Sequence, residues 1–219
     1  IWLCCLLLAG CERRETAPQA QPAEPAPDYA GTILAAGDSL TAGLGVAQED
    51  AWPALLAKKL AENGHQWRVI NAGISGETSS GMLARSKWLL AQRPEIVIVA
   101  TGANDGLRGI PPPLIKENIA QTVRLLQEGG ATSVLAGMQI VQNLGEDYSR
   151  EFAAIYPAVA SEQRCIIIPF LLEAVAGEQS LNPEDTIHPT EQVHRIIAET
   201  VYPFVLQAIQ ARPPPAPRP

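Results

Sequence analysis

The sequence predicts an α/β fold, a three-layer α/β/α sandwich built around a five-stranded parallel sheet. Short apolar runs rich in β-branched residues alternate along the chain with longer segments of helical periodicity. The apolar runs are continuous rather than alternating, which is typical of parallel strands buried on both faces. We expect strands at 32–36, 67–71, 96–101, 133–137 and 165–170, and helices at 51–63, 79–92, 114–128, 148–162 and 191–210.

The ends of the predicted helices are marked by residues that cap a helix or cannot continue it. Asn63-Gly64 and Gly129-Gly130 are expected to end two of them, because glycine readily adopts the left-handed backbone found just past a helix. Thr190 can cap the start of the last helix. Pro203 lies inside that helix, so we expect it to kink the helix or to end it early.

The first eleven residues form a separate segment. Residues 1–8 are apolar but too few to cross a bilayer as a helix. The run ends in Leu8-Ala9-Gly10-Cys11, which resembles the lipobox of bacterial lipoproteins, where cleavage leaves the cysteine as a lipidated N-terminus. We therefore interpret 1–11 as a lipoprotein signal peptide and Cys11 as the residue that anchors the protein to a membrane. An ordinary secretory signal with an incidental cysteine is the alternative.

The rest of the chain divides into a tether, one domain and a tail. Residues 12–30 are rich in proline and alanine and cannot bury a core, so they are expected to form a semi-extended tether. The domain is predicted at 31–211, and 212–219 is a proline-rich tail. Cys165 stands in an apolar run and is expected in the core. The cysteine and histidine spacings indicate no metal site, and no cofactor is expected.

The charge of the chain excludes one class of partner. The formal net charge is −7, and no Lys/Arg-rich run occurs. Nucleic acid is therefore not an expected partner, because binding to phosphates requires a basic surface.

We expect the protein to be a monomer.

Gly37-Asp38-Ser39-Leu40 follows the first predicted strand and offers a candidate nucleophile, Ser39. Glycine and aspartate suit a tight turn that exposes the serine hydroxyl. In doubly wound folds ligands bind at the carboxyl ends of the strands, where this turn lies. A purely structural turn or helix cap is the alternative for this short motif taken by itself.

Asp185-Thr186-Ile187-His188-Pro189 precedes the last predicted helix and offers a base and its partner. One turn can present both side chains, so that the Asp185 carboxylate holds the His188 imidazole while the other ring nitrogen faces the serine. The alternative is an aspartate that caps the last helix beside an exposed histidine. His65 is expected in an exposed turn, and His194 is expected to face solvent on the last helix.

Gly73 and Asn104 follow the second and third predicted strands and are candidate oxyanion donors. The backbone N–H groups of Ser39 and Gly73 and the side-chain amide of Asn104 could stabilise the negative oxygen of a tetrahedral intermediate. The alternatives are a plain turn glycine at 73 and an Asx turn of Asn104 with Asp105.

The chain resembles the SGNH, or GDSL, hydrolase family, whose four blocks match Ser39, Gly73, Asn104 and His188. Further similarity, at 51–56, 71–78, 104–109 and 154–157, is to the bacterial periplasmic thioesterase/lysophospholipase/arylesterase (TesA-like) subgroup. The resemblance implies a flavodoxin-like sandwich and a metal-independent serine esterase or thioesterase of the bacterial envelope. It also implies Asp185 as the triad acid and an acyl-enzyme intermediate. Small-molecule or lipid esters would be the substrates, and the lipid anchor would face the periplasm.

The resemblance further implies a fatty-acyl groove near 137–148, with Ile140, Val141 and Leu144 as candidate substrate-binding residues. The alternative is that these are core residues next to the fourth strand. One departure stands in the third block, where Ala103 replaces the glycine usual in the subgroup. Its methyl group would force a different backbone if that position requires a positive φ.

Two other functions stay open: a carbohydrate O-acetylesterase of the cell envelope, and a non-catalytic surface lipoprotein with the same fold.

Overall fold

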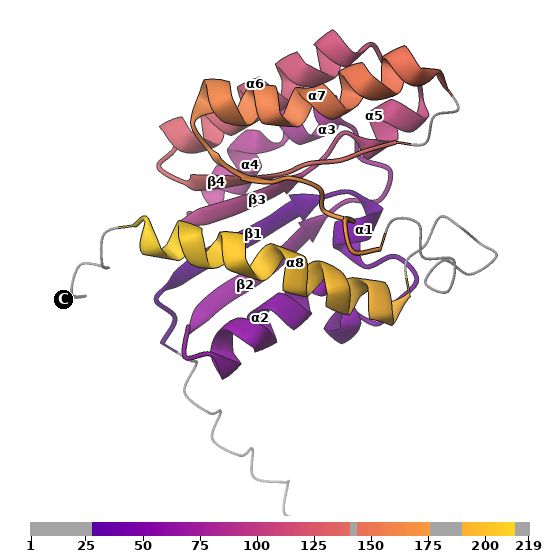
Figure 1. The fold of residues 1–219 in the computed structure, drawn as a ribbon. Coiled ribbons are helices and arrows are strands. Elements are labelled where there is room, and N and C mark those ends of the chain that lie inside the picture. Colours follow the sequence, from indigo (N-terminus) through magenta and orange to yellow (C-terminus); the bar gives the residue numbers. More distant parts are fainter. Residues whose placement is uncertain (1–27, 141–143, 176–189, 213–219) are drawn as a thin grey trace, which may run out of the picture.

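The computed structural model describes residues 28–140, 144–175 and 190–212. Within them, five strands form one sheet in the order β2-β1-β3-β4-β5 (Figure 1). Every neighbouring pair of strands is parallel, which confirms the predicted sheet. The strands are β1 (Gly31–Gly37), β2 (Trp67–Gly73), β3 (Ile96–Ala100), β4 (Thr132–Ala136) and β5 (Ile166–Ile168).

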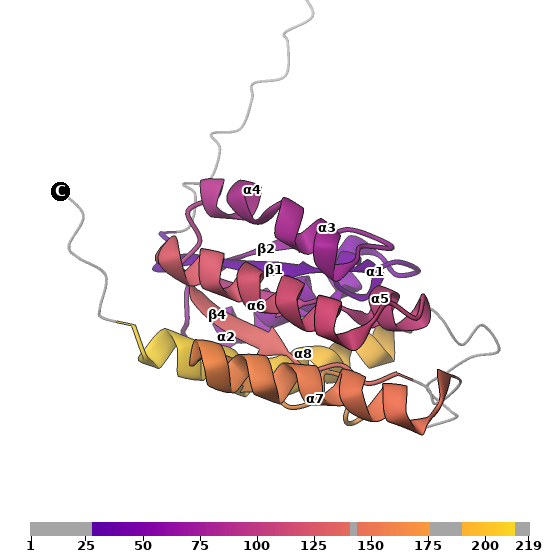
Figure 2. The same cartoon turned by 90° about the horizontal axis from the view of Figure 1, so that it is seen from above.

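Helices lie on both sides of the sheet and complete the predicted three layers (Figure 2). On one face α2 packs against α8, and on the other α6 packs against α3, α4 and α7. None of the helices in the described part of the chain combines the length and apolar character needed to span a bilayer. The helices are α1 (Ser39–Ala42), η1 (Gln48–Asp50), α2 (Trp52–Glu62), α3 (Ser79–Ala84), α4 (Ser86–Ala91), α5 (Ala103–Leu107), α6 (Pro112–Glu128), α7 (Glu146–Gln163) and α8 (Glu191–Gln210).

The core lies along the three central strands. β1, β3 and β4 are buried almost throughout, as their continuous apolar sequences predict. In β2 only Ala72 is buried, while Arg68 and Asn71 are exposed. The prediction that this strand is buried on both faces is therefore wrong, because β2 pairs only with β1 and forms an edge of the sheet.

Two predicted helices differ from their expected form. The segment predicted as one helix is divided at Arg85, which ends α3 and begins α4. The Arg85 guanidinium makes a bidentate ion pair with Glu77, with Nε–Oε1 and Nη2–Oε2 distances of 2.5 and 2.6 Å. α8 continues through Pro203 to its predicted end, although this proline removes one backbone donor. The apolar face of α8 is packed in the core on both sides of Pro203, at Val201 and Val205, which keeps the helix continuous.

The predicted helix ends at the two glycine pairs are confirmed. Asn63 ends α2 and Gly129 ends α6, and the glycine that follows each has a positive φ, +81° at Gly64 and +87° at Gly130. A residue with a Cβ atom adopts this left-handed backbone only at a cost in energy.

His194 does not face solvent as expected but is fully buried in α8. Its Nδ1 accepts a hydrogen bond of 3.2 Å from the backbone N–H of Trp52, the first residue of α2. The first N–H groups of a helix have no partner within the helix, so α8 caps α2 through this ring. Burial lowers the pKa of His194 below 6.5, which keeps the ring neutral and able to accept this bond.

Acid is expected to destabilise the fold through His194. The folded-state pKa lies below the unfolded one, so the unfolded chain takes up a proton that the folded chain cannot, and stability is lost as pH falls below about 6.5. His194→Asn keeps an acceptor near the Nδ1 position but does not titrate. Urea unfolding at pH 7 and pH 5 gives the change in unfolding free energy for each protein. Relative to the variant, the wild type should lose stability on going to pH 5, by up to about 1.4 kcal/mol per pH unit, because the other titrating groups contribute equally to both proteins. Equal changes in both proteins would contradict the assignment.

Candidate active site

The candidate site lies at the carboxyl edge of the sheet, where β1 passes directly into α1 (Figure 1). Asp38 caps α1: its Oδ1 accepts a hydrogen bond of 3.1 Å from the Leu40 N–H. Ser39 is the first residue of the helix and is half-buried. The helix ends after one turn at Gly43, which has the left-handed backbone. This cap fixes where Ser39 leaves the strand.

A cavity of about 190 Å³ opens beside Ser39. It brings together residues that follow β1, β3, β4 and β5, as expected where parallel strands end at one edge of a sheet. Two predicted site residues, Ser39 and Asn104, line it together. The full lining is Asp38, Ser39, Leu40, Ala103, Asn104, Leu107, Met138, Gln139, Phe170 and Leu172.

Asp38 and Asn104 are joined across this cavity. The Asn104 Nδ2 donates a hydrogen bond to Asp38 Oδ2 over 3.3 Å. Asp38, which caps α1, therefore also orients the Asn104 side chain on α5. Asp38 is only 4% exposed. Burial, with a smaller contribution from the negative charge of Glu77, raises the pKa of Asp38 to about 6. Sequence reasoning treated Asp38 only as a turn residue.

Gly73 is a glycine because β2 and α1 approach very closely there. A Cβ atom at this position would lie 2.2 Å from the backbone nitrogen of Ala42. The Gly73 N–H, predicted as an oxyanion donor, donates to Asn71 Oδ1 over 2.9 Å. Gly73 is not among the residues that line the cavity. The structure therefore brings two of the three predicted oxyanion donors to the cavity and places the third against the helix that carries Ser39.

Ala103 does not distort the third block. The residue with positive φ is Gly102, at +108°, and a Cβ atom there would lie 2.5 Å from the Tyr156 hydroxyl. Ala103 is the first residue of α5 and is not among the positive-φ residues, so its methyl group fits an ordinary helical backbone. Ala103 itself lines the cavity together with Ser39 and Asn104.

Several predicted site residues fall elsewhere. Asp185, His188, Val141 and Cys11 lie outside the described residues. Ile140 packs against the core, and Leu144 is exposed just before α7; neither lines the cavity.

Met138 and Gln139, which line the cavity, lie within the segment 137–148 predicted to border an acyl groove. Sequence reasoning missed the cavity residues Phe170 and Leu172. The signal that could have found them is their position directly after β5, at the same edge of the sheet as Ser39.

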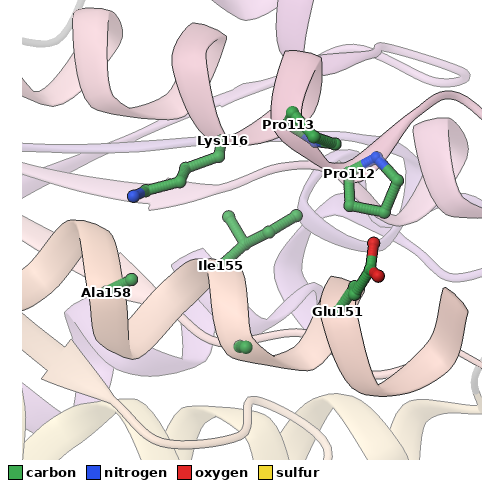
Figure 3. Close-up of a pocket in the computed structure, with 7 residues that line it drawn as sticks. Pro112, Pro113, Lys116, Glu151, Ile155 and Ala158 are labelled. Atoms are coloured by element: carbon green, nitrogen blue, oxygen red, sulfur yellow. The ribbon is translucent and has the colours of Figure 1, made fainter. Parts of the chain in front are cut away.

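Other features of the described residues do not belong to this site. Cys165 is only half-buried rather than in the core, and burial raises its pKa to about 11, which leaves a thiol that is not nucleophilic at neutral pH. Within the described ranges, no three His, Cys, Asp or Glu residues gather as ligands for a metal ion. A hollow of about 320 Å³ lies between α6 and α7 (Figure 3), and no predicted site residue lines it. Its lining is Pro112, Pro113, Lys116, Glu151, Ala154, Ile155 and Ala158.

Comparison with known proteins decides the family. The model of the GDSL-like lipase/acylhydrolase family matches residues 35–196. The chain belongs to this family. The esterase TesA of Pseudomonas aeruginosa is 39% identical over 90% of this chain and 96% of its own. The thioesterase 1/protease 1/lysophospholipase L1 of Escherichia coli is 37% identical over 78% of this chain and 81% of its own.

Structural comparison agrees with the family match. A crystal structure of TesA superposes with a TM-score of 0.78 and 40% identity, covering 81% of this chain and 99% of that one. This GDSL-family chain is therefore a serine hydrolase of carboxylic esters or thioesters, which confirms the predicted resemblance, fold class and reaction class.

In this GDSL-family site, replacing Asp38 with asparagine is expected to raise stability and to lower kcat. A folded pKa near 6, against 3.8 unfolded, means that the folded state binds the proton more tightly, so wild-type stability falls as pH rises between these values. At pH 7 the buried charge costs on the order of 3 kcal/mol, part of which Asp38→Asn recovers. The asparagine cannot accept both bonds, so Asn104 loses its orientation.

Urea unfolding of both proteins at pH 4.5 and 7, with steady-state kinetics at pH 7, tests this expectation. The stability gain of Asp38→Asn should be larger at pH 7 than at pH 4.5. A stability gain that does not change with pH would show that burying the charged Asp38 carboxylate does not destabilise the fold. An unchanged kcat would show that Asn104 does not need the hydrogen bond to Asp38 for its orientation.

Proposed function

We propose that this protein cleaves acyl esters and thioesters through a Ser39–His188–Asp185 triad and an acyl-enzyme intermediate. Ser39 attacks the carbonyl carbon while His188 takes the hydroxyl proton, and Asp185 holds the imidazole in the required tautomer. His188 then gives the proton to the departing alcohol or thiol. A water molecule activated by the same histidine releases the acid and restores Ser39.

The observation that carries this proposal is the shared cavity of Ser39 and Asn104. A carbonyl carbon at the Ser39 hydroxyl places its oxygen between the helix that starts at Ser39 and the Asn104 amide. The Ser39 N–H and the Asn104 side chain are then the oxyanion donors on the cavity wall. Gly73 can serve as the third only if its N–H is shared with, or released by, the Asn71 side chain that now accepts it.

The cavity wall favours an apolar acyl group. Apolar side chains supply most of its lining, at Leu40, Ala103, Leu107, Met138, Phe170 and Leu172. Related enzymes named as an esterase and as a thioesterase and lysophospholipase support esters or thioesters of apolar acids as the substrate class. An O-acetylesterase of envelope carbohydrates would instead require a polar wall to bind the sugar.

Hydrolysis of p-nitrophenyl acetate, butyrate, octanoate and palmitate by the full chain tests the substrate class. The expected result is a kcat/KM that is higher for butyrate and octanoate than for acetate. Activity confined to acetate would transfer the assignment to the acetylesterase, and a folded but inert protein would transfer it to the non-catalytic lipoprotein.

Covalent labelling tests the nucleophile independently of substrate preference. A fluorophosphonate forms a stable adduct with an activated serine, so peptide mass spectrometry is expected to find the adduct on Ser39 in native protein and not in urea-unfolded protein. An adduct on another serine, or equal labelling after unfolding, would overturn the assignment of Ser39.

We further propose a location in the bacterial cell envelope, facing the periplasm. The support is the sequence of residues 1–11, with its apolar run and lipobox-like end, and the tether at 12–30 before the domain at 31–211. Lipid on Cys11 would hold the domain close to a membrane. Mass spectrometry of the N-terminal peptide from protein made in a bacterial host should find a diacylglyceryl modification on Cys11. An unmodified cysteine would refute the lipid anchor and leave the alternative interpretation of residues 1–11 as an ordinary secretory signal.

A further inference from the structure

Large apolar side chains are exposed mainly at one edge of the described structure. Four of them follow the carboxyl ends of successive strands: Leu44 after α1, Ile74 after β2, Leu107 at the end of α5 and Leu144 before α7. Leu114 lies in the first turn of α6, which follows α5. The remaining one, Trp88, belongs to α4, which lies at the other end of the molecule from α1 and α5 (Figure 2).

We call the first four side chains, Leu44, Ile74, Leu107 and Leu144, the apolar rim. The segments that carry them are held close together. The Asn71 side chain donates to the Ala42 carbonyl, which joins the end of β2 to the end of α1. The Arg108 Nη2 donates to the Gly76 carbonyl over 3.1 Å, which joins the end of α5 to the loop after β2. A Cβ atom at Gly109 would lie 3.8 Å from Leu144 Cδ1.

The apolar rim is continuous with the substrate cavity. Leu107 belongs to both: it lines the cavity beside Ser39 and is 63% exposed. The cavity holds about 190 Å³, below the roughly 300–1,000 Å³ typical of sites that enclose a drug-sized ligand. A long acyl chain would therefore leave the cavity across exposed leucine and isoleucine. Soluble proteins rarely expose grouped apolar side chains without a partner for them.

We infer that the apolar rim docks on the surface of aggregated neutral or zwitterionic acyl lipids, so that the mouth of the cavity opens against the lipid. This inference rests on the proposed ester substrates. The charges of the edge exclude an anionic surface as the preferred one, because anionic lipids attract clusters of Lys and Arg. Arg108 is an exposed cation between the rim segments, whereas Glu49 and Glu146 are exposed acids on the neighbouring segments. The exposed Asp147 pairs with Arg150 and adds no net charge.

Flotation of the protein with vesicles of ether-linked phosphatidylcholine tests the docking surface, since ether lipids cannot be hydrolysed. The proteins are full chains with Cys11→Ser in common, so that none carries lipid and any affinity of the N-terminal segment is shared. The rim variant is Leu44→Ser/Ile74→Ser, whose two changes lie outside the cavity lining. The matched control is Trp88→Ser, which removes an equally exposed large side chain at the other end.

The rim variant is expected to partition into the vesicles less strongly, by roughly tenfold for each side chain removed, while Trp88→Ser partitions like the parent. All three proteins should hydrolyse monomeric p-nitrophenyl butyrate at equal rates. The inference is overturned if the parent does not float with phosphatidylcholine, if it floats only with phosphatidylglycerol vesicles, or if Trp88→Ser weakens partition as much as the rim variant. Single variants Leu44→Ser and Ile74→Ser replace the double variant if circular dichroism shows that it is unfolded.

The two measurements separate this inference from the proposed function. Loss of p-nitrophenyl butyrate hydrolysis in the parent protein would refute the proposed esterase activity, whatever the vesicles show. Normal hydrolysis without any difference between the rim variant and its control would refute the docking surface alone.

Discussion

Replacing Ser39 with alanine is expected to lower kcat/KM for p-nitrophenyl butyrate by about 10⁴- to 10⁶-fold. The hydroxyl oxygen forms the bond to the acyl carbon, and no other group on the described cavity wall can take that role. Asp38 is a carboxylate, Asn104 and Gln139 are amides, and the other lining side chains are apolar. The residual rate would come from direct attack of water on the bound substrate, with the oxyanion donors still stabilising the intermediate.

The fold should survive this substitution. The bonds that close α1 run to the Ser39 backbone carbonyl, from the N–H groups of Gly43 and Leu44, at 3.1 Å each. Alanine keeps that carbonyl and has a higher helix propensity than serine. Equal urea midpoints for both proteins would therefore assign the loss of activity to chemistry rather than to unfolding.

Ser75→Ala is the matched control, because Ser75 is an exposed serine in the loop after β2, at the same edge of the sheet. It should retain full activity. Hydrolysis that persists in a Ser39→Ala preparation free of contaminating esterases would assign the nucleophile to another residue.

The fold and the convergence of the site loops could be predicted from the sequence because both depend on local pattern. Continuous apolar runs and interposed helices dictate a parallel sheet, and a parallel sheet brings all its carboxyl ends to one edge. Ser39 and Asn104 therefore meet in one cavity, although they are far apart in the chain. The roles of Asp185 and His188 remain predictions, since both lie outside the described residues.

The short helices could not be predicted in this way. α1 has four residues and α5 has five, so neither completes enough turns to show helical periodicity. A local cap begins α1, where the Asp38 carboxylate accepts a hydrogen bond from the Leu40 N–H. A tertiary contact places the start of α5, where the Gly102 backbone lies close to the Tyr156 hydroxyl.

The burial of Asp38 and His194, and the pKa shifts that follow from it, could not be predicted from the sequence pattern either. Asp38 reads as a turn residue, and its raised pKa comes from burial by segments distant in the chain. His194 reads as a polar residue on a helix, and its burial follows from the packing of α8 on α2. A pattern of residue types does not distinguish such a buried polar group from an exposed one, because only its tertiary partners make burial tolerable.

A second large effect is expected at Asp105, the residue after Asn104. Its carboxylate is 2% exposed and accepts two hydrogen bonds from Ser79, from the backbone N–H over 2.7 Å and from the hydroxyl over 2.6 Å. The Ser79 hydroxyl in turn accepts from Asn118 Nδ2 over 3.0 Å. Asp105 thus ties α5 to the start of α3 and, through Ser79, to α6.

Asp105→Ala is expected to lower the free energy of unfolding by about 3–5 kcal/mol. The substitution leaves a buried N–H and a buried hydroxyl without their acceptor, and each such group costs about 1–3 kcal/mol. Domains of this size are typically stable by only about 5–15 kcal/mol, so the loss is a large part of the total. Asp147→Ala is the matched control: Asp147 is an exposed aspartate paired with Arg150 on α7, and its loss should cost less than about 0.5 kcal/mol.

Asp105→Asn separates stability from catalysis. Its amide oxygen can still accept from the Ser79 N–H, while its NH₂ group replaces the acceptor that the Ser79 hydroxyl needs, so the stability loss should be smaller than in Asp105→Ala. Because α5 carries both Asp105 and Asn104, any shift of this helix misdirects the oxyanion donor. We expect kcat for p-nitrophenyl butyrate to fall with little change in KM, measured well below the unfolding midpoint of the variant. A normal kcat in a destabilised Asp105→Asn protein would show that this network holds the fold together but does not aim Asn104.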